Sequence, residues 1–124
     1  MNRQELAKLI DHTLLKPEAT SDEVIAHCQQ AIDLGVYAVC VSPTYVELAK
    51  QSVSNQLKVA TVCGFPSGKH QSSIKAMEAT LAVQQGADEI DMVIDVGRAV
   101  VGDWSAIEAD ITAVRLMIPD ALLK

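Results

Sequence analysis

The chain has 124 residues, of which 49% are apolar and only 3% aromatic, so it is long enough for one domain with an aliphatic core. Ten basic residues against sixteen acidic ones give a net charge of −6, which excludes a bulk electrostatic attraction to nucleic acid or to an anionic membrane. The sequence has no run that approaches the about 18 consecutive apolar residues of a membrane-spanning helix.

Apolar runs alternate with amphipathic stretches, which predicts alternating strands and helices. Strands are predicted at residues 11–15 (a short strand or a turn), 36–41, 58–63 and 89–94. Helices are predicted at residues 5–10, 22–34, 43–53, 72–86 and 105–117, with loops at 64–68 and 96–103. Residues 122–124 look like the approach to a further strand that the chain does not reach. This order predicts about four βα units with parallel strands in one domain over residues 1–124.

Two α/β architectures fit this order: a small open doubly wound sheet, as in a flavodoxin-like binding domain, or the N-terminal half of a TIM (β/α)8 barrel. A complete barrel needs roughly 200 residues or more. The run at 89–95 separates the two, because alternate residues of a strand point to opposite faces. One face carries Ile90, Met92 and Ile94, and the other carries Glu89, Asp91, Val93 and Asp95. An apolar face suits a helix layer and an acidic face suits a barrel axis, so the pattern favours the half-barrel.

Asp91 is the strongest candidate for chemistry in the sequence. It lies in mid-strand between apolar residues, where a carboxylate is costly unless a partner or a reaction uses it. A structural ion pair is the alternative role. Glu89 and Asp95 are weaker candidates, because the first is expected at the stability end of the strand and the second in the following loop.

The other polar motifs do not predict a phosphate loop or a metal centre. The glycines of the segment Gly64–Lys69 are separated by three residues, whereas a phosphate loop has four between them and Ser or Thr after the lysine. His12, His27 and His70 lie far apart on different predicted elements, without metal-ligand spacing. We therefore expect no metal. At residues 64–69 we expect a tight strand-to-helix turn or, as the alternative, a loop whose backbone amides line a substrate pocket.

The cysteines predict a reducing compartment. Cys28, Cys40 and Cys63 form an odd set without a CxxC motif, and each lies in an aliphatic run, which is typical of buried free thiols. The N-terminus also lacks the basic start and apolar stretch of a secretion signal. A cytoplasmic location is expected.

Four blocks in order, at residues 11–17, 38–43, 62–68 and 86–94, resemble the deoxyribose-phosphate aldolase family, class I aldolases with a β/α barrel. The resemblance extends over the whole chain. It implies the reversible cleavage of 2-deoxy-D-ribose 5-phosphate to D-glyceraldehyde 3-phosphate and acetaldehyde. In this family a lysine amine forms a Schiff base with the substrate carbonyl, so that no metal or organic cofactor is implied.

The resemblance also assigns roles to individual residues. Asp91 matches the family's proton-relay aspartate. Positions near the substrate pocket are matched by Thr13, Leu15, Cys40, Val62 and Phe65. Asp95, where the family often has Asn, and Arg98 depart from the pattern. Family members are about twice as long, and their Schiff-base lysine, its partner lysine and the phosphate loops are expected beyond Lys124. The chain alone is therefore expected to be inactive or nearly so.

A half-barrel would leave two open strand edges and an uncovered axial face. We therefore expect a homo-oligomer, with two chains paired edge to edge or by exchange of elements into a closed dimer. A phosphorylated sugar or an aldehyde is the expected small-molecule partner, and neither nucleic acid nor a membrane is expected. The alternative function is a non-catalytic half-barrel module that self-associates.

Overall fold

The chain forms one sheet of five parallel strands in the sequential order β1-β2-β3-β4-β5, described here from a computed structural model that covers residues 1–124. The strands are β1 (Asp11–Leu14), β2 (Ala38–Val41), β3 (Lys58–Cys63), β4 (Glu89–Met92) and β5 (Leu122–Leu123). The helices are α1 (Arg3–Ala7), α2 (Ser21–Leu34), α3 (Val46–Val53), α4 (Ser72–Gln84), α5 (Val96–Val100) and α6 (Trp104–Met117), with a 3₁₀ turn η1 at Pro43–Tyr45.

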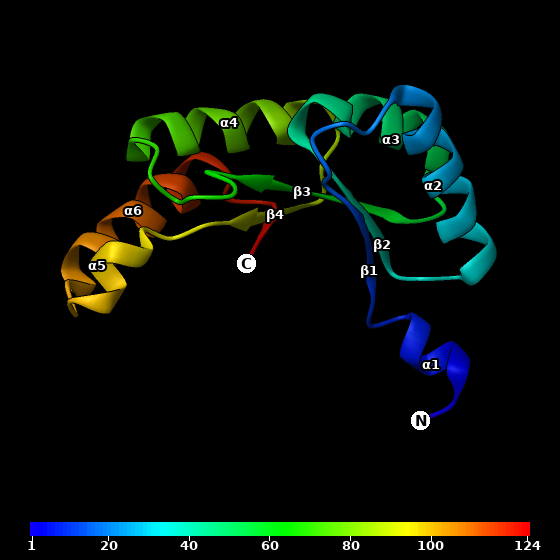
Figure 1. Ribbon diagram of the computed structural model, residues 1–124, viewed down its shortest axis with the longest axis horizontal. Coiled ribbons are helices and arrows are strands. Elements are labelled where there is room, and N and C mark those ends of the chain that lie inside the picture. The colour runs from blue at the N-terminus through cyan, green and yellow to red at the C-terminus, as the bar shows by residue number, and fades with distance from the viewer.

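The sheet is curved, and its helices lie on one side. Helices α2, α3 and α4 run along the outer side of the strands, while the inner side carries no helix (Figure 1). An open doubly wound sheet would carry helices on both faces. Sequential parallel order with one helix layer is the arrangement of a β/α barrel, so the prediction of the N-terminal half of such a barrel is confirmed.

The main core fills the space between the sheet and its helices. Val39, Val41, Val59 and Ile90 are fully buried there, together with small residues of α2, α3 and α4. Alternate strand residues face the inner side, which we call the axial face; a second, smaller apolar cluster there contains Cys40, Ala60 and Val62. Each strand therefore contributes to two different environments, as a period of two requires.

Local signals place several element ends as predicted. Thr20 and Glu23 form a reciprocal capping box at the start of α2, which satisfies two free backbone N–H groups. Gly35 ends α2 in the left-handed conformation at φ 64°, which a residue with a Cβ seldom adopts. At Pro43 the prediction needs correction, because the proline begins η1 and the α-helix starts only at Val46.

Four further boundaries differ from the prediction. The first helix lies earlier, at residues 3–7, because Asn2 caps it with Glu5. Strand β4 ends at Met92, two residues early, and the predicted loop at 96–103 contains the short helix α5, capped by Asp95. The expectation that no further strand is reached was wrong: β5 pairs in parallel with β4, with Leu122 opposite Glu89. None of the helices has the length and apolar character that a membrane crossing requires.

Candidate active site on the axial face

Four charged side chains from the edge and centre of the sheet meet on the axial face. Lys124, directly after β5, extends its ammonium between the carboxylates of Asp11, Glu89 and Asp91. Lys124 Nζ donates a hydrogen bond to Asp11 Oδ2 over 2.5 Å and lies 3.2 Å from both Glu89 Oε2 and Asp91 Oδ1. We call Asp11, Glu89, Asp91 and Lys124 the axial cluster.

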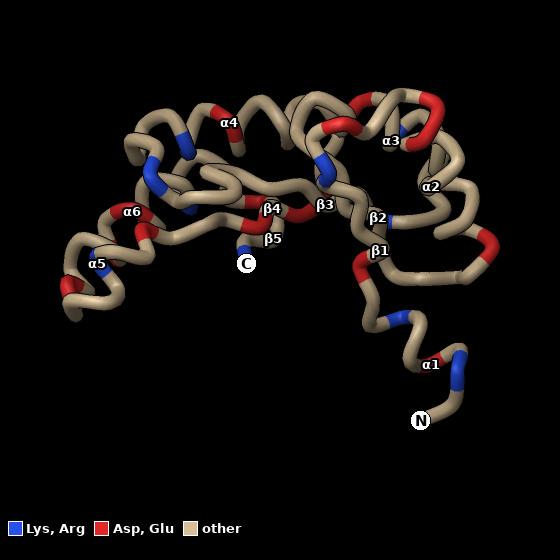
Figure 2. The backbone as a smooth tube through the Cα atoms, in the orientation of Figure 1, with Lys and Arg blue, Asp and Glu red and all other residues tan.

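Strand geometry explains this convergence. Ile90 and Met92 pack into the helix-covered core, so Glu89 and Asp91 must point to the axial face. Pairing of β5 beside β4 brings Lys124 alongside them, and its long side chain reaches Asp11 on the opposite edge strand. Figure 2 shows the acidic stretch of β4 near the basic C-terminal end and that of β1 across the open side of the sheet. The ion pair between Lys124 and Asp11 joins residues 113 positions apart.

The cluster has an excess of negative charge, three carboxylates against one ammonium. Glu89 Oε2 and Asp91 Oδ1 are buried oxygens that accept no aligned hydrogen bond, although each lies within ion-pair distance of Lys124. Burial lowers the pKa of Lys124, but the hydrogen bond from its ammonium to Asp11 and the nearby Asp91 and Glu89 carboxylates raise it above its usual value. Lys124 is therefore a charged partner of the acids at neutral pH and not a free amine.

Most of the predicted pocket residues surround this cluster. Thr13 and Cys40 are directly paired across β1 and β2, and Val62 is paired with Asp91 across β3 and β4. Leu15 packs against the apolar cluster that contains Cys40 and Val62. The structure therefore brings these four predicted residues and Asp91 to the same face.

Phe65 is the predicted residue that lies apart. It follows β3 in the loop at residues 64–71, is 43% exposed, and belongs to neither apolar cluster. Burial, followed by the nearby Asp91 and Asp11 charges, raises the pKa of Cys40 to about 11. A thiol with that pKa is protonated at neutral pH, so Cys40 is not a nucleophile here.

Sequence reasoning did not select Asp11 or Lys124. Lys124 lies in none of the four blocks that resemble the family, and only the pairing of β5 with β4 places it on one face with Leu122 and Glu89. Asp11 opens β1, and only the ion pair with Lys124 marks it out. A period-two pattern continued through residues 122–124 is the signal that could have found the lysine.

The histidines have a different environment. His12 and His27 stack with ring centroids 4.1 Å apart and planes inclined by 4°. His12 Nε2 is 2.8 Å from Gln30 Oε1, and His27 Nε2 is 2.8 Å from the His12 carbonyl oxygen. These contacts join β1 to α2 on the helix-covered side of the sheet, away from the axial cluster.

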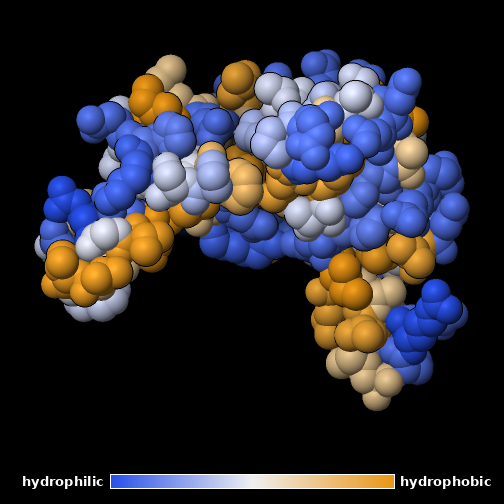
Figure 3. Space-filling view, in the orientation of Figure 1, coloured by the Kyte–Doolittle hydropathy of each residue, from blue (hydrophilic) through white to orange (hydrophobic).

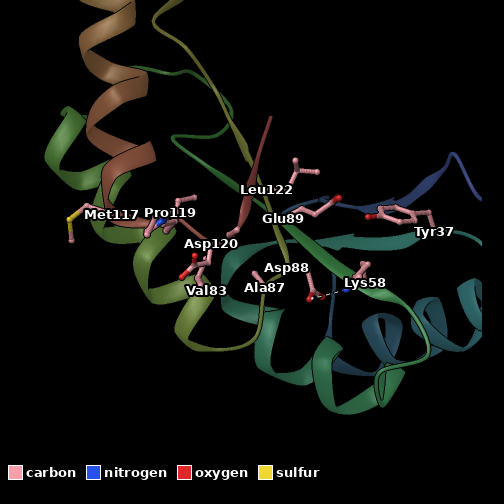
Figure 4. Close-up of a pocket in the computed structure, with 12 residues that line it drawn as sticks. Tyr37, Lys58, Val83, Ala87, Asp88, Glu89, Met117, Pro119, Asp120 and Leu122 are labelled. Carbon is pink, nitrogen blue, oxygen red and sulfur yellow. Dashed lines mark ion pairs between the residues drawn. The ribbon is translucent and has the colours of Figure 1, made fainter.

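A cavity of about 600 Å³ opens at the N-terminal ends of β3, β4 and β5. Figure 4 shows Tyr37 and Glu89 approaching it from one side, and Lys58 paired with Asp88 below them. The Lys58 Nζ to Asp88 Oδ1 distance is 3.8 Å. Active sites of β/α barrels lie at the opposite, C-terminal ends of the strands. We therefore assign this cavity to the stability face of the fold.

Parallel strands in sequential order, one helix layer (Figure 1) and an acidic axial face define half of a β/α barrel. The model of the DeoC/LacD family aldolases matches residues 6–116. The chain belongs to the DeoC/LacD aldolase family.

Individual relatives agree with this family. The chain is 58% identical to a deoxyribose-phosphate aldolase of Mycolicibacterium paratuberculosis, over 98% of this chain and 54% of that protein. It is 57% identical to the enzyme of the same name from Mycobacterium ulcerans, over 98% of this chain and 53% of the relative. The chain thus spans about half the length of the curated relatives it matches.

Solved structures show the same relation. A Coccidioides immitis protein assigned to the deoxyribose-phosphate aldolases superimposes with a TM-score of 0.94 at 36% identity, over 99% of this chain and 49% of that one. The tetrameric deoxyribose phosphate aldolase from Aeropyrum pernix superimposes with a TM-score of 0.76 at 28% identity, over 98% of this chain and 52% of that one.

Proposed function

We propose that residues 1–124 form one partial β/α-barrel domain that supplies half of a deoxyribose-phosphate aldolase active site. The reaction would be the reversible cleavage of 2-deoxy-D-ribose 5-phosphate to D-glyceraldehyde 3-phosphate and acetaldehyde. The observation that carries the proposal is the position of Asp91, a carboxylate on the axial face of an aldolase-family barrel, beside Lys124 and Asp11.

Asp91 is proposed as the proton relay of a Schiff-base mechanism. A lysine amine attacks the sugar carbonyl and water leaves, which forms an iminium ion. When the carbon–carbon bond breaks, its electron pair moves to the iminium and gives an enamine, while a base accepts the proton of the substrate's C3 hydroxyl group, whose oxygen becomes the aldehyde of glyceraldehyde 3-phosphate; protonation of the enamine and hydrolysis of the resulting iminium then release acetaldehyde and the lysine. Asp91 would accept that proton and later help to return one to the enamine carbon. This route needs neither a metal nor an organic cofactor.

Thr13, Leu15, Cys40, Val62 and Phe65 are proposed to line the substrate pocket. Apolar and small side chains beside the acid would exclude water from the iminium and leave room for a short aldehyde. The first four support this role by their place on the axial face. Phe65 would contribute only from the mouth, since it lies in the loop after β3.

The nucleophilic lysine is proposed to lie outside these 124 residues. Lys124 is held charged among carboxylates, and Lys75 is buried in an ion pair with Asp110. A Schiff-base nucleophile needs a free amine that can reach the substrate. We therefore expect the chain on its own to be inactive or nearly so.

Borohydride trapping with acetaldehyde tests the first part of the proposal. The isolated chain should show no stoichiometric lysine adduct by intact mass, because it has no accessible free amine on the axial face. A stoichiometric adduct would contradict the proposed inactivity and would locate the nucleophile by peptide mapping.

Complementation tests the second part. Addition of a chain that carries the remaining strands of a family member should restore cleavage of deoxyribose 5-phosphate. Asp91→Asn should then lower the restored kcat by about 10²–10⁴-fold, as expected for loss of a general acid–base group. Asp33→Asn on the outer face of α2 is the matched control and should leave kcat unchanged. Restored activity that Asp91→Asn does not reduce would refute the assigned role.

Self-association is proposed as the second property of the chain, as an edge-paired or domain-swapped dimer. Strands β1 and β5 each pair with one neighbour only. Apolar surface also gathers on the two projecting parts of the molecule that flank the axial face, one around α1 and one around α5 and the start of α6 (Figure 3). The exposed apolar residues there are Leu6, Leu9, Val100, Val101 and Trp104. Sedimentation should show a dimer at micromolar concentration. A well-folded monomer would refute it, and a dimer that no complementing chain converts to an aldolase would favour a non-catalytic half-barrel module.

A cytoplasmic, reducing location is proposed from the cysteines. Cys28, Cys40 and Cys63 are all free and buried, as is typical of proteins kept under reducing conditions. Fractionation of cells that express the tagged chain would test the location, and recovery outside the cytoplasm would contradict it.

A further inference from the structure

A buried lysine that the proposed reaction does not use lies behind β4. Lys75, on α4, is 1% exposed although lysine is seldom fully buried. Its Nζ donates to Asp110 Oδ2 of α6 over 2.6 Å and to the backbone carbonyl oxygen of Val93 over 2.9 Å. Val93 directly follows β4 and lies two residues after Asp91. One ammonium thus connects two helices with the end of the strand that carries the proposed proton relay.

The end of the adjacent strand, β3, leaves room for the side chain of Lys75. A Cβ on Gly64, directly after β3, would come within 2.8 Å of Lys75 Cε, so any side chain there would have to displace the methylene chain of the lysine. Gly64 also has φ +65°, which disfavours other residues. Val93 N in turn donates to the Cys63 carbonyl oxygen over 3.0 Å. Lys75 therefore crosses the end of β3 and anchors the end of β4.

The opposite end of β4 carries a more exposed counterpart. The methylene chain of Lys50, on α3, packs against Gly86. Its Nζ lies 3.4 Å from Oδ2 of Asp88, the residue just before β4. Its side chain is 30% exposed, against 1% for Lys75. A buried ion pair gives little net stability compared with apolar residues, because both charges lose their hydration. Burial of Lys75 is therefore poorly explained by stability alone.

We propose that Lys75 is a positioning residue: by holding the Val93 carbonyl, with Asp110 as its counter-ion, it sets the course of the β4 end and thereby the approach of the Asp91 carboxylate to Lys124. The value of this for catalysis rests on the proposed aldolase function. The positioning itself rests only on the contacts of Lys75, and it is tested without an activity assay.

The double variant Lys75→Met, Asp110→Leu separates positioning from stability. It removes both buried charges together, so its urea midpoint should stay at or above that of the parent chain. With the Val93 carbonyl released, NMR of the folded protein should show shifted or doubled signals for Asp91 ¹³Cγ and Lys124 ¹⁵Nζ. Lys50→Met, at the other end of β4, is the matched control and should leave both signals in place.

Unchanged Asp91 and Lys124 signals in a folded double variant would overturn the proposal. If the double variant does not fold, Asp110→Asn provides the second measurement, because it keeps the shape of the site and removes only the counter-ion. That variant should displace the same signals by a smaller amount, and unchanged signals would again overturn the proposal. Displaced signals in a chain that no complementation makes active would support positioning and refute the aldolase function separately.

Discussion

The two faces of the sheet have opposite compositions although the same strands build them. The helix-covered face is aliphatic, with Val39, Val59 and Ile90 fully buried. The axial face places three carboxylates around the ammonium of Lys124 and leaves two carboxylate oxygens without an aligned hydrogen bond. Stability therefore comes mainly from the first face, and charged groups that can serve chemistry are kept on the second.

The largest difference between the two faces is expected when the polarity of two neighbouring β4 residues, Ile90 and Asp91, is reversed. Ile90→Asp places a carboxylate without a partner in the helix-covered core, so we expect a loss of at least about 3–5 kcal/mol and, in practice, an unfolded chain. Asp91→Leu, one residue on but facing the axis with 36% of its side chain exposed, should change the free energy of unfolding by less than about 1 kcal/mol. Urea denaturation followed by circular dichroism measures both.

Similar losses for the two variants would contradict the division of roles between the faces. Ile90→Val serves as the matched control for the first variant, because it keeps an apolar side chain at the same position. Its expected loss is about 1 kcal/mol.

Removal of the Lys124 ammonium measures how much the axial cluster contributes to the free energy of unfolding. Lys124→Met leaves three carboxylates close together, so we expect a loss of about 1 kcal/mol near pH 7, a modest value because the lysine is 39% exposed. The raised pKa of Lys124 means that its stabilising effect is complete below the ordinary lysine pKa and is lost only at higher pH. The difference between parent and variant should therefore stay constant from pH 6 to pH 9. Lys8→Met in the exposed turn after α1 is the control, and an equal effect of the two variants would contradict the prediction.

The smallest effect is expected from a second polar pair on the helix-covered side, the stacked His12 and His27. Burial lowers the pKa of His27 despite its hydrogen bond to the His12 carbonyl, and the His12 charge lowers it further. The unfolded chain then binds more protons in this range, so the parent should lose stability as the pH falls below about 6.5.

His27→Gln, which can still donate to the His12 carbonyl, should remove this part of the pH dependence, by less than about 1 kcal/mol between pH 7 and pH 5. Unfolding titrations at several pH values measure it. His70→Gln, in the exposed loop before α4, should keep the slope of the parent. A parent slope that survives in His27→Gln would assign the effect to other groups.

Much of the fold and part of the site could be predicted from local patterns. Alternation at residues 89–92 placed Asp91 opposite the core, and the capping signals at Thr20 and Gly35 located α2. The buried role of Lys75 could not be predicted, because α4 exposes Ile74, Met77 and Leu81 while it buries this lysine. A helix with apolar residues on its outer side gives no sequence signal of which face is inside.

The sequence by itself determined the order of four strands and five helices and the face to which Glu89 and Asp91 point, because both depend on a few neighbouring residues and on the fixed periods of strand and helix. Only the tertiary structure decided which charges meet. Lys124 reaches Asp11 across the whole sheet, and Lys75 reaches Val93 and Asp110 through a gap that Gly64 leaves open. Contacts of this kind depend on parallel register and helix packing, which bring together residues far apart in the chain and leave no local periodicity.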